Sequence, residues 1–280
     1  MDPLLIVIGI AAAVSLFCWV ASIITKDTSW VDRLWSVVPA VYVWVFAIAA
    51  LVAGEEATRL VVMAVLVTAW GARLTFNFAR KGGYTGMEDY RWAILRARMS
   101  PAQFRLFNVF FIVLYQNALL VLISLPALIA WQNPAPFTGW DAAFAVLFVL
   151  FLAGEFIADQ QQWDFHKAKH TAGGTLEPGF LTTGLWRYSR HPNFFFEQAQ
   201  WWAFYALGAA AAVAAGAGVW GGVINWTIIG AALLTVLFIG STVFTESISA
   251  SKYPAYAQYQ RTTSMLVPLP PRQRPAEANA

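Results

Sequence analysis

The stretch GLWRYSRHPNFFFEQAQWW, at positions 184–202, stands directly before a long apolar segment. It combines Arg187, Arg190, His191, Asn193 and Glu197 with several aromatic residues. Guanidinium groups bind carboxylate or phosphate oxygens through paired hydrogen bonds, and amide and carboxylate oxygens accept hydrogen bonds from hydroxyl and N–H groups. The stretch therefore indicates a site for a polar ligand at one end of an apolar helix.

Three segments carry polar side chains at spacings of three or four residues, which place them on one face of a helix. Ionisable groups inside a membrane are costly and usually serve function. The stripes predict a site for a hydrogen-bonding ligand, with hydrogen bonds between packed helices as the structural alternative. They comprise Glu155, Asp159 and Gln162; Asn193 and Glu197; and Thr242, Glu246, Ser249 and Tyr253.

Two loops combine glycine with arginine. Residues 79–92 contain Arg80 and Arg91, and residues 179–193 contain Arg187 and Arg190. Bare backbone N–H groups and guanidinium groups can converge on phosphate oxygens, which favours a phosphorylated ligand. Basic loops that contact anionic lipid headgroups are the alternative. Neither the dinucleotide-binding glycine fingerprint nor the P-loop pattern occurs in the chain.

The segment TSWVDRLWSVVPA places an acid, Asp32, between Trp30 and Trp35. The carboxylate could be a helix cap or could pair with Arg33. It could instead be a buried acid that donates a hydrogen bond to a substrate carbonyl, which would make it the catalytic acid. Both interpretations remain open at this stage.

The composition indicates whether these polar residues lie in a soluble or a membrane protein. The 280 residues are 59% hydrophobic and 12% charged, whereas soluble domains carry about 25% charged residues. The chain is therefore an integral membrane protein. Its net charge of +3 and the lack of a basic run argue against nucleic-acid binding. A single cysteine excludes an internal disulfide, and HKAKH lacks the glutamate of a zinc-binding helix, so no metal is expected.

Apolar runs of about 20 residues predict an all-α, polytopic membrane protein with seven transmembrane helices. Lysine and arginine concentrate after the first, third and fifth helices and in the C-terminal tail. The N-terminus should therefore lie outside and the C-terminus in the cytoplasm. We expect one membrane domain over residues 1–268 and a disordered tail over 269–280. The predicted helices are 3–24, 34–53, 58–79, 104–131, 141–162, 194–215 and 221–246.

Four motifs together resemble the bacterial DUF1295 branch of the steroid 5-alpha-reductase superfamily. They are GLWRYSRHPNFFFEQAQWW, GEFIADQQQWDFHK, GMEDYRW and FTESISASKYPAYAQYQRTTSMLVPLPP, and they occur in the same order over most of the chain. The S-R-H-P-N-(x3)-E core also occurs in sterol reductases and in isoprenylcysteine carboxyl methyltransferases of the wider superfamily. The core alone therefore does not choose the reaction.

The resemblance implies a seven-helix enzyme in which the first four helices enclose a substrate cavity and the last three hold NADPH. It implies hydride transfer to a conjugated carbon–carbon double bond, with a hydrogen-bond donor on the substrate carbonyl. Asp32 is the nearest match to the catalytic acid, and Trp70 stands near the position of a family tyrosine. The substrate-cavity candidates are Trp30, Trp35, Trp70, Tyr115 and Gln116. The cofactor candidates are Arg80, Arg91, Asp159, Arg187, Tyr188, Arg190, His191, Asn193, Glu197, Glu246, Tyr253 and Tyr256.

The leading hypothesis is thus an NADPH-dependent reductase of a 3-oxo-Δ4-steroid-like or other enone lipid. It would be a monomer of the bacterial inner membrane, surrounded by membrane lipids, with its cofactor site facing the cytoplasm. The first alternative is an S-adenosylmethionine-dependent lipid or prenylcysteine methyltransferase, whose donor carries no phosphate. The second is a non-catalytic lipid-binding protein. The arginines of the two loops favour the reductase.

Overall fold

The computed structural model describes residues 1–174 and 176–272, and over these residues the chain is helical. Its one isolated bridge in this part of the chain pairs Ser189 with Ser264. The predicted all-α class is confirmed. The chain divides into two compact units. We call Met1–Val146 with Trp202–Leu234 the N-terminal unit, and Leu147–Trp201 with Thr235–Ala280 the C-terminal unit.

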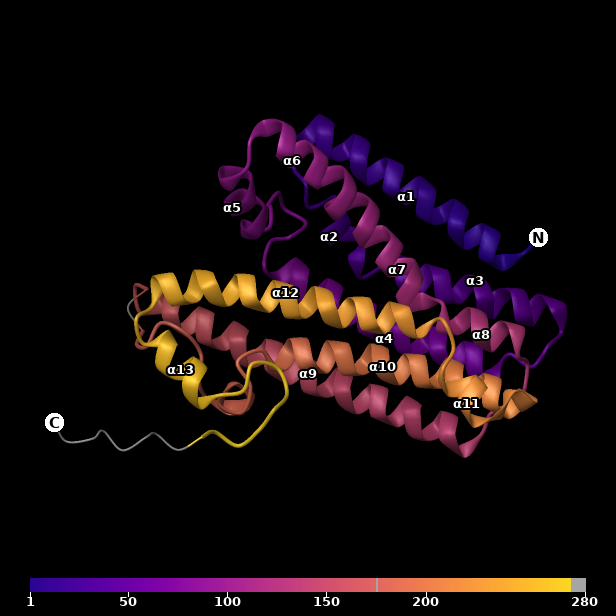
Figure 1. Ribbon diagram of the computed structural model, residues 1–280. Helices are drawn as coiled ribbons and strands as arrows, with labels where there is room; N and C mark the ends of the chain where they lie inside the picture. Colours follow the sequence, from indigo (N-terminus) through magenta and orange to yellow (C-terminus); the bar gives the residue numbers. More distant parts are fainter. Residues whose placement is uncertain (175, 273–280) are drawn as a thin grey trace. The chain divides into compact units, whose positions relative to one another are not determined.

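Figure 1 labels the α-helices and shows how they follow one another along the chain. The first half contains α1 (Pro3–Thr25), α2 (Trp30–Trp35), α3 (Val38–Ala53), α4 (Thr58–Arg80), α5 (Tyr90–Arg98), α6 (Pro101–Phe107), the π-helix η1 (Asn108–Tyr115), α7 (Gln116–Ser124) and α8 (Pro126–Gln132). The second half contains α9 (Gly139–Thr171), the 3-10 helix η2 (Gly184–Arg187), α10 (Pro192–Ala212), the π-helix η3 (Val213–Ala217), α11 (Gly218–Val223), α12 (Ile228–Lys252) and α13 (Tyr256–Thr262).

Six helical segments are long and apolar enough to cross a membrane, and they match six of the seven predicted spans. The seventh prediction, 194–215, corresponds to α10, which has sufficient length. Polar residues such as Glu197, Gln198 and Gln200 make its first half less apolar than the six spans. The six segments are Pro3–Thr25, Trp30–Ala53, Thr58–Arg80, Pro101–Gln132, Gly139–Thr171 and Ile228–Lys252.

The last predicted helix, 221–246, is interrupted in the structure. Helix α11 ends at Val223, and α12 begins only at Ile228. Between them the Asn225 side chain accepts a hydrogen bond from the backbone N–H of Thr227 at 3.1 Å. This local hydrogen bond competes with helix formation, which is why asparagine favours turns. The apolar character of the run hid this break from the sequence pattern.

Small residues let the helices of the N-terminal unit approach closely. A Cβ added to Gly71 of α4 would meet the Ser36 carbonyl oxygen at 2.2 Å. One added to Gly208 of α10 would meet the Pro126 oxygen at 2.6 Å, and one on Gly230 of α12 the Leu122 oxygen at 2.4 Å. Around them α3 packs against α4, α7 and α8, and α1 against α3 and α7. Close backbone packing is a principal source of helix association in lipid.

A buried ion pair joins the start of α4 to the start of α9 within the N-terminal unit. Arg59 Nε donates to Asp141 Oδ1 at 2.7 Å and Arg59 Nη2 to Asp141 Oδ2 at 2.8 Å. The guanidinium also donates to the carbonyls of Ala135 and Pro136, and the backbone N–H of Thr138 donates to Asp141. The side chains are 3% and 0% exposed. The pair is therefore desolvated and fully hydrogen-bonded, which is the condition for a stable buried ion pair.

Asp141→Asn should lower the free energy of unfolding by about 3–5 kcal/mol, because it leaves the Arg59 guanidinium buried without its counter-charge. Replacing the pair together, by Arg59→Met with Asp141→Leu, should recover most of the loss. Thermal unfolding in detergent measures both variants, with the exposed Glu55→Gln as the control. An Asp141→Asn variant that is as stable as the wild type would contradict a stabilising role for the Arg59–Asp141 pair.

Candidate functional site

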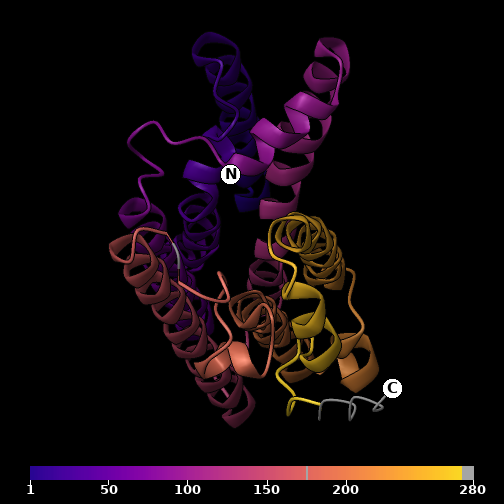
Figure 2. The same cartoon turned by 90° about the vertical axis from the view of Figure 1, so that its left-hand side faces the viewer.

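The polar stripes of α9 and α10 face each other in the C-terminal unit. Gln200 Nε2 donates to Glu155 Oε2 at 2.6 Å, and Asn193 Nδ2 donates to Asp159 Oδ1 at 3.3 Å. The Phe196 ring covers Gly154, where a Cβ would lie only 2.6 Å from it. Figures 1 and 2 show α9, α10 and α12 side by side in this unit. The predicted convergence of the α9 and α10 stripes is confirmed.

Three oxygen atoms in this unit are buried and have no hydrogen-bond partner in the described part of the chain. They are Asn193 Oδ1, Gln200 Oε1 and Thr242 Oγ1. Both amides use their N–H groups on carboxylates of α9, so their carbonyl oxygens remain unpaired. Such an atom costs about 1–3 kcal/mol. A ligand that brings N–H or O–H donors would remove this cost.

Arg190 and Glu246 form a buried pair between the start of α10 and α12. Arg190 Nε donates to Glu246 Oε1 at 2.6 Å and Nη2 to Oε2 at 3.0 Å. His191 Nε2 lies 3.1 Å from the same carboxylate, and Gln260 Nε2 donates to it at 2.9 Å. Arg190 Nη1 donates to the carbonyls of Gln260 and Thr263. Arg190 thus directs its guanidinium into the fold, whereas the sequence suggested a phosphate ligand.

The segment after α13 lies along the RHPN loop. The Arg190 N–H donates to the Ser264 carbonyl at 2.8 Å, and the Leu269 N–H donates to the Tyr188 carbonyl at 2.9 Å. Ser189 Oγ donates to the Leu266 carbonyl at 2.6 Å. The tail predicted to be disordered, 269–280, therefore begins with Leu269, which is hydrogen-bonded. Residues 273–280 of this tail lie outside the described residues.

Four aromatic side chains form a cluster in the C-terminal unit. The Phe180 ring lies 5.7, 4.9 and 5.4 Å from the rings of Tyr253, Tyr256 and Tyr259. Lys169 Nζ donates to Tyr253 Oη at 2.9 Å, and this bond lowers the pKa of the Tyr253 phenol. Burial raises the pKa of Tyr256 and of Tyr259. The cluster therefore holds one tyrosine with an acidified phenol and two with suppressed ionisation.

The glycines of the second loop make room for side chains of the same unit. Gly179 has a φ of 92°, and its missing Cβ would lie 2.4 Å from the Tyr253 ring. The missing Cβ of Gly184 would lie 2.5 Å from the Gln161 amide. Both glycines thus have an internal packing role. In this loop the exposed candidates for a ligand are Arg187 and Tyr188, while Glu197 is buried.

In the N-terminal unit, Asp32 is held by a tryptophan that the sequence reasoning did not select. Trp92 Nε1 donates to Asp32 Oδ2 at 2.8 Å. Trp92 itself is buried in an apolar cluster with Cys18 and Val31. Its occurrence in the quoted motif GMEDYRW was the available signal. The indole therefore joins the candidate catalytic acid to the packed core of the unit.

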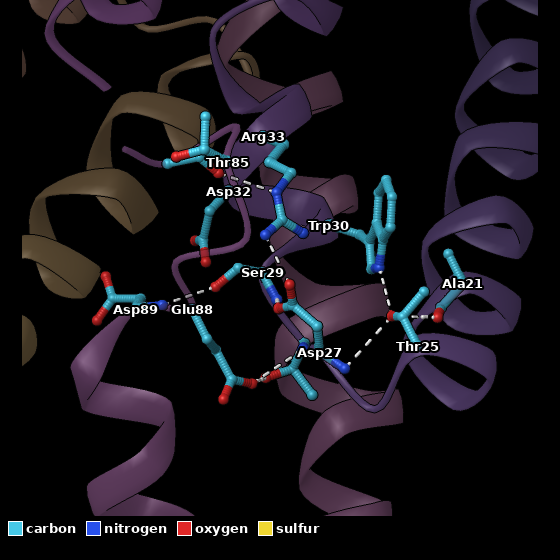
Figure 3. Close-up of polar contacts among 12 residues, drawn as sticks. Ala21, Thr25, Asp27, Ser29, Trp30, Asp32, Arg33, Thr85, Glu88 and Asp89 are labelled. Carbon is cyan, nitrogen blue, oxygen red and sulfur yellow. Dashed lines mark hydrogen bonds and ion pairs between the residues drawn. The ribbon is translucent and has the colours of Figure 1, made fainter. Parts of the chain in front are cut away.

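The segment around Asp32 is fastened to the loop before α5, as Figure 3 shows. Glu88 Oε1 accepts from the N–H and the hydroxyl of Thr28 at 3.0 and 2.8 Å. The Asp89 N–H donates to Ser29 Oγ at 3.0 Å. Arg33 donates to the Gly83 carbonyl at 3.0 Å. These bonds link residues fifty to sixty positions apart into one polar network.

Asp32 is neither the cap nor the ion-pair partner that the sequence left open. Arg33 Nη2 instead pairs with Asp27 Oδ2 at 2.6 Å (Figure 3), and its guanidinium carbon lies 4.9 Å from the centre of the Trp30 ring. Ser29 occupies the N-cap position of α2. Asp32 instead lies in the first turn of α2 and accepts the Trp92 hydrogen bond, and its role as the catalytic acid stays a prediction.

Arg80 and Arg91 both belong to the N-terminal unit. Arg91 Nη2 pairs with Asp89 Oδ2 at 2.8 Å, and Arg80 Nε donates to Asn77 Oδ1 at 2.9 Å. Burial lowers the pKa of Arg91, but the hydrogen bonds and charge of Asp89 outweigh it and raise the pKa. Arg91 is thus fixed in its charged form beside Asp32.

The predicted cavity residues separate into two groups. Trp30 and Trp35 pack against the apolar cluster around Trp92, and the ring of Tyr115 stacks on Phe111 of that cluster at 5.4 Å. Trp70 on α4 and Gln116 on α7 are buried but lie outside this cluster. The structure thus brings Trp30, Trp35 and Tyr115 together.

Tyr42 was missed because a lone tyrosine in an apolar run has no spacing signal. It is fully buried in α3, and its hydroxyl has no hydrogen-bond partner among the described residues. Asn117 of α7 donates to the Val113 carbonyl at 2.8 Å, and its Oδ1 is likewise unpaired. Since α3 packs against α7, the N-terminal unit also contains unsatisfied polar groups.

The fold and these two clusters define a helical membrane protein that buries hydrogen-bonding groups within its spans. The chain belongs to the family described as "Protein of unknown function (DUF1295)", which matches residues 18–263. An uncharacterized protein of the fission yeast Schizosaccharomyces pombe is 40% identical over 266 residues, which cover 89% of this chain and 75% of that protein. No solved structure matches. The DUF1295 resemblance is confirmed, while the yeast relative gives no support for a bacterial branch.

Arg190→Gln should reduce the free energy of unfolding by about 3–5 kcal/mol without any ligand, because Glu246 would remain buried without its partner. The matched control is Arg187→Gln, three residues away and exposed, which should stay within about 0.5 kcal/mol of wild type. Thermal unfolding in detergent measures both. Equal stability of the two variants would show that Arg190 has no structural role.

The lowered pKa of Glu88 predicts that the stability of the fold depends on pH. Burial raises the pKa of its carboxyl, but hydrogen bonds from Arg96 and Thr28 outweigh burial and hold it below its ordinary value of 4.5. Its contribution should be complete above pH 4.5 and should disappear as the pH falls through the lowered pKa. Unfolding midpoints between neutral and acidic pH should therefore converge for wild type and Glu88→Gln. A constant difference, or the same convergence in the exposed control Glu177→Gln, would refute the assignment.

Proposed function

We propose that this chain is an NADPH-dependent reductase of a conjugated carbon–carbon double bond in a hydrophobic membrane substrate, within the steroid 5-alpha-reductase superfamily. The carrying observation is the set of buried acceptor oxygens in the C-terminal unit, Asn193 Oδ1, Gln200 Oε1 and Thr242 Oγ1. Membrane proteins keep unsatisfied polar groups in their spans mainly where a ligand or water completes them.

A nicotinamide nucleotide fits part of this donor and acceptor set. Its carboxamide N–H and ribose hydroxyl groups would complete Asn193 Oδ1 and Thr242 Oγ1, and the exposed Arg187 would bind a phosphate. Arg190 does not fit the phosphate role, because its donors are used by Glu246 and by two carbonyls. The cofactor role of Arg80 and Arg91, which belong to the N-terminal unit, stays a prediction. When bound, the nucleotide supplies the hydride.

The N-terminal unit would hold the substrate. Asp32, oriented by the Trp92 indole, would hold a proton against the substrate carbonyl and stabilise the charge that develops there. Trp30, Trp35 and Tyr115 would exclude water around that carbonyl. An enone lipid, such as a 3-oxo-Δ4-steroid, has the required carbonyl and apolar body.

Orientation in the membrane follows from charge. We propose seven spans, including α10, with the N-terminus outside, the cofactor site facing the cytoplasm, and a monomer in a bacterial inner membrane. The exposed Trp140, Trp220 and Trp226 stand beside connections that contain no lysine or arginine. Tryptophan collects at membrane interfaces and basic residues collect on the cytoplasmic side, so these residues would mark the outer interface.

One observation favours S-adenosylmethionine as the second candidate cofactor. The interior of the C-terminal unit presents the carboxylates of Glu155, Asp159 and Glu197, all buried. A cationic sulfonium matches buried carboxylates, and the internal pairing of Arg190 removes one of the expected phosphate contacts. This cofactor would make the protein a lipid or prenylcysteine methyltransferase.

Thermal unfolding of the detergent-purified protein with NADPH, NADH and S-adenosylmethionine separates these functions. A ligand at about a hundred times its Kd adds about 2.7 kcal/mol of stability. NADPH should stabilise wild type, while Asn193→Ala should lose the shift and Arg187→Gln should weaken it without changing ligand-free stability. The exposed Lys167→Gln on α9 is the control. Stabilisation by S-adenosylmethionine alone would overturn the reductase, and no shift with any nucleotide would leave the non-catalytic lipid-binding protein.

A further inference from the structure

A basic corner stands at the start of the fourth membrane span. We use this name for Tyr90–Phe107, which comprises α5 and α6. It contains four arginines and no acidic residue. Helix α6 begins the span Pro101–Gln132, so the corner lies at the end of a membrane-crossing helix. Neither the cofactor nor the substrate of the proposed function accounts for the arginines on the solvent-exposed side of this corner.

Two of the four arginines build the corner. Arg96 pairs with Glu88 at 2.6 Å, and its guanidinium carbon lies 4.8 Å from the centre of the Phe104 ring on α6. Arg91 pairs with Asp89 at the start of α5. The turn between the two helices has a capping box, in which Ser100 and Gln103 exchange side-chain and backbone hydrogen bonds. The corner therefore has a defined shape.

The other two arginines, Arg98 and Arg105, lie on the exposed side. Large apolar side chains are exposed in and beside the same corner: Tyr90 is 53%, Leu106 60% and Phe110 63% accessible. Guanidinium groups suit lipid phosphates, and neighbouring apolar side chains suit the acyl boundary just below them. This combination is typical of an interfacial surface.

We propose that the basic corner is a binding site for anionic phospholipid headgroups, with Arg98 and Arg105 as the phosphate-binding residues. Charge complementarity supports an anionic occupant, because Tyr90–Phe107 contains four arginines and no acidic residue. Its continuity with a span and its exposed apolar side chains favour lipid over an acidic protein segment. The two phosphate-binding residues, Arg98 and Arg105, are not among the proposed cofactor contacts.

Native mass spectrometry of the detergent-purified full chain tests this site. The protein is titrated with phosphatidylglycerol and, separately, with phosphatidylcholine. Wild type should retain phosphatidylglycerol preferentially, and Arg98→Gln with Arg105→Gln should lower that affinity by about tenfold or more. The matched control removes two exposed cations of the C-terminal unit, Lys167→Gln with Arg261→Gln, and should keep the preference. Higher salt should weaken the wild-type preference.

An unchanged preference in the corner variant would overturn the proposal. An equal loss in the control variant would also overturn it, since net charge and not this site would then govern retention. Lipid-free thermal unfolding accompanies the titration, so that a folding defect is not counted as lost binding. Copurification of a stoichiometric acidic protein with wild type, together with no response to phosphatidylglycerol, would assign the corner to a protein partner instead.

Discussion

A hydrogen-bonding group inside hydrocarbon has no water to complete it, and this constraint shapes the whole molecule. The Arg59–Asp141 and Arg190–Glu246 pairs satisfy it with several converging bonds each, so their charges can be buried. The side-chain oxygens of Asn193, Gln200 and Thr242 do not satisfy it. The same rule therefore separates polar groups that hold the fold from polar groups that still need a partner.

This distinction changes how the two arginines shortly before α10 are understood. Arg187 and Arg190 look equivalent in the sequence, since both follow glycines in one short loop. Arg190 binds the C-terminal segment and α12, while Arg187 is exposed. Arginine in a motif can thus preserve the shape of a site without contacting its ligand. A chemical role cannot be transferred between two such residues by their type alone.

The sequence predicted most of the helices because a membrane span leaves a long apolar run bounded by charges. The helices Pro3–Thr25 and Thr58–Arg80 agree with prediction to within one residue at each end. The break before Ile228 was invisible to that pattern, because one side chain, Asn225, causes it. Helical periodicity also predicted the meeting of the α9 and α10 stripes. It gave no information on bonds between distant segments, such as that from Trp92 to Asp32, because periodicity reports only neighbours on one helix.

The two units are interleaved along the chain. The N-terminal unit needs residues 202–234, and the C-terminal unit needs residues from 235 onward. During synthesis the first unit therefore stays incomplete until part of the second has already left the ribosome. A chain that stopped after α10 would leave Arg190 without Glu246 of α12. Such a fragment would carry the Arg190 guanidinium without its counter-charge, which gives membrane quality control a signal to remove it.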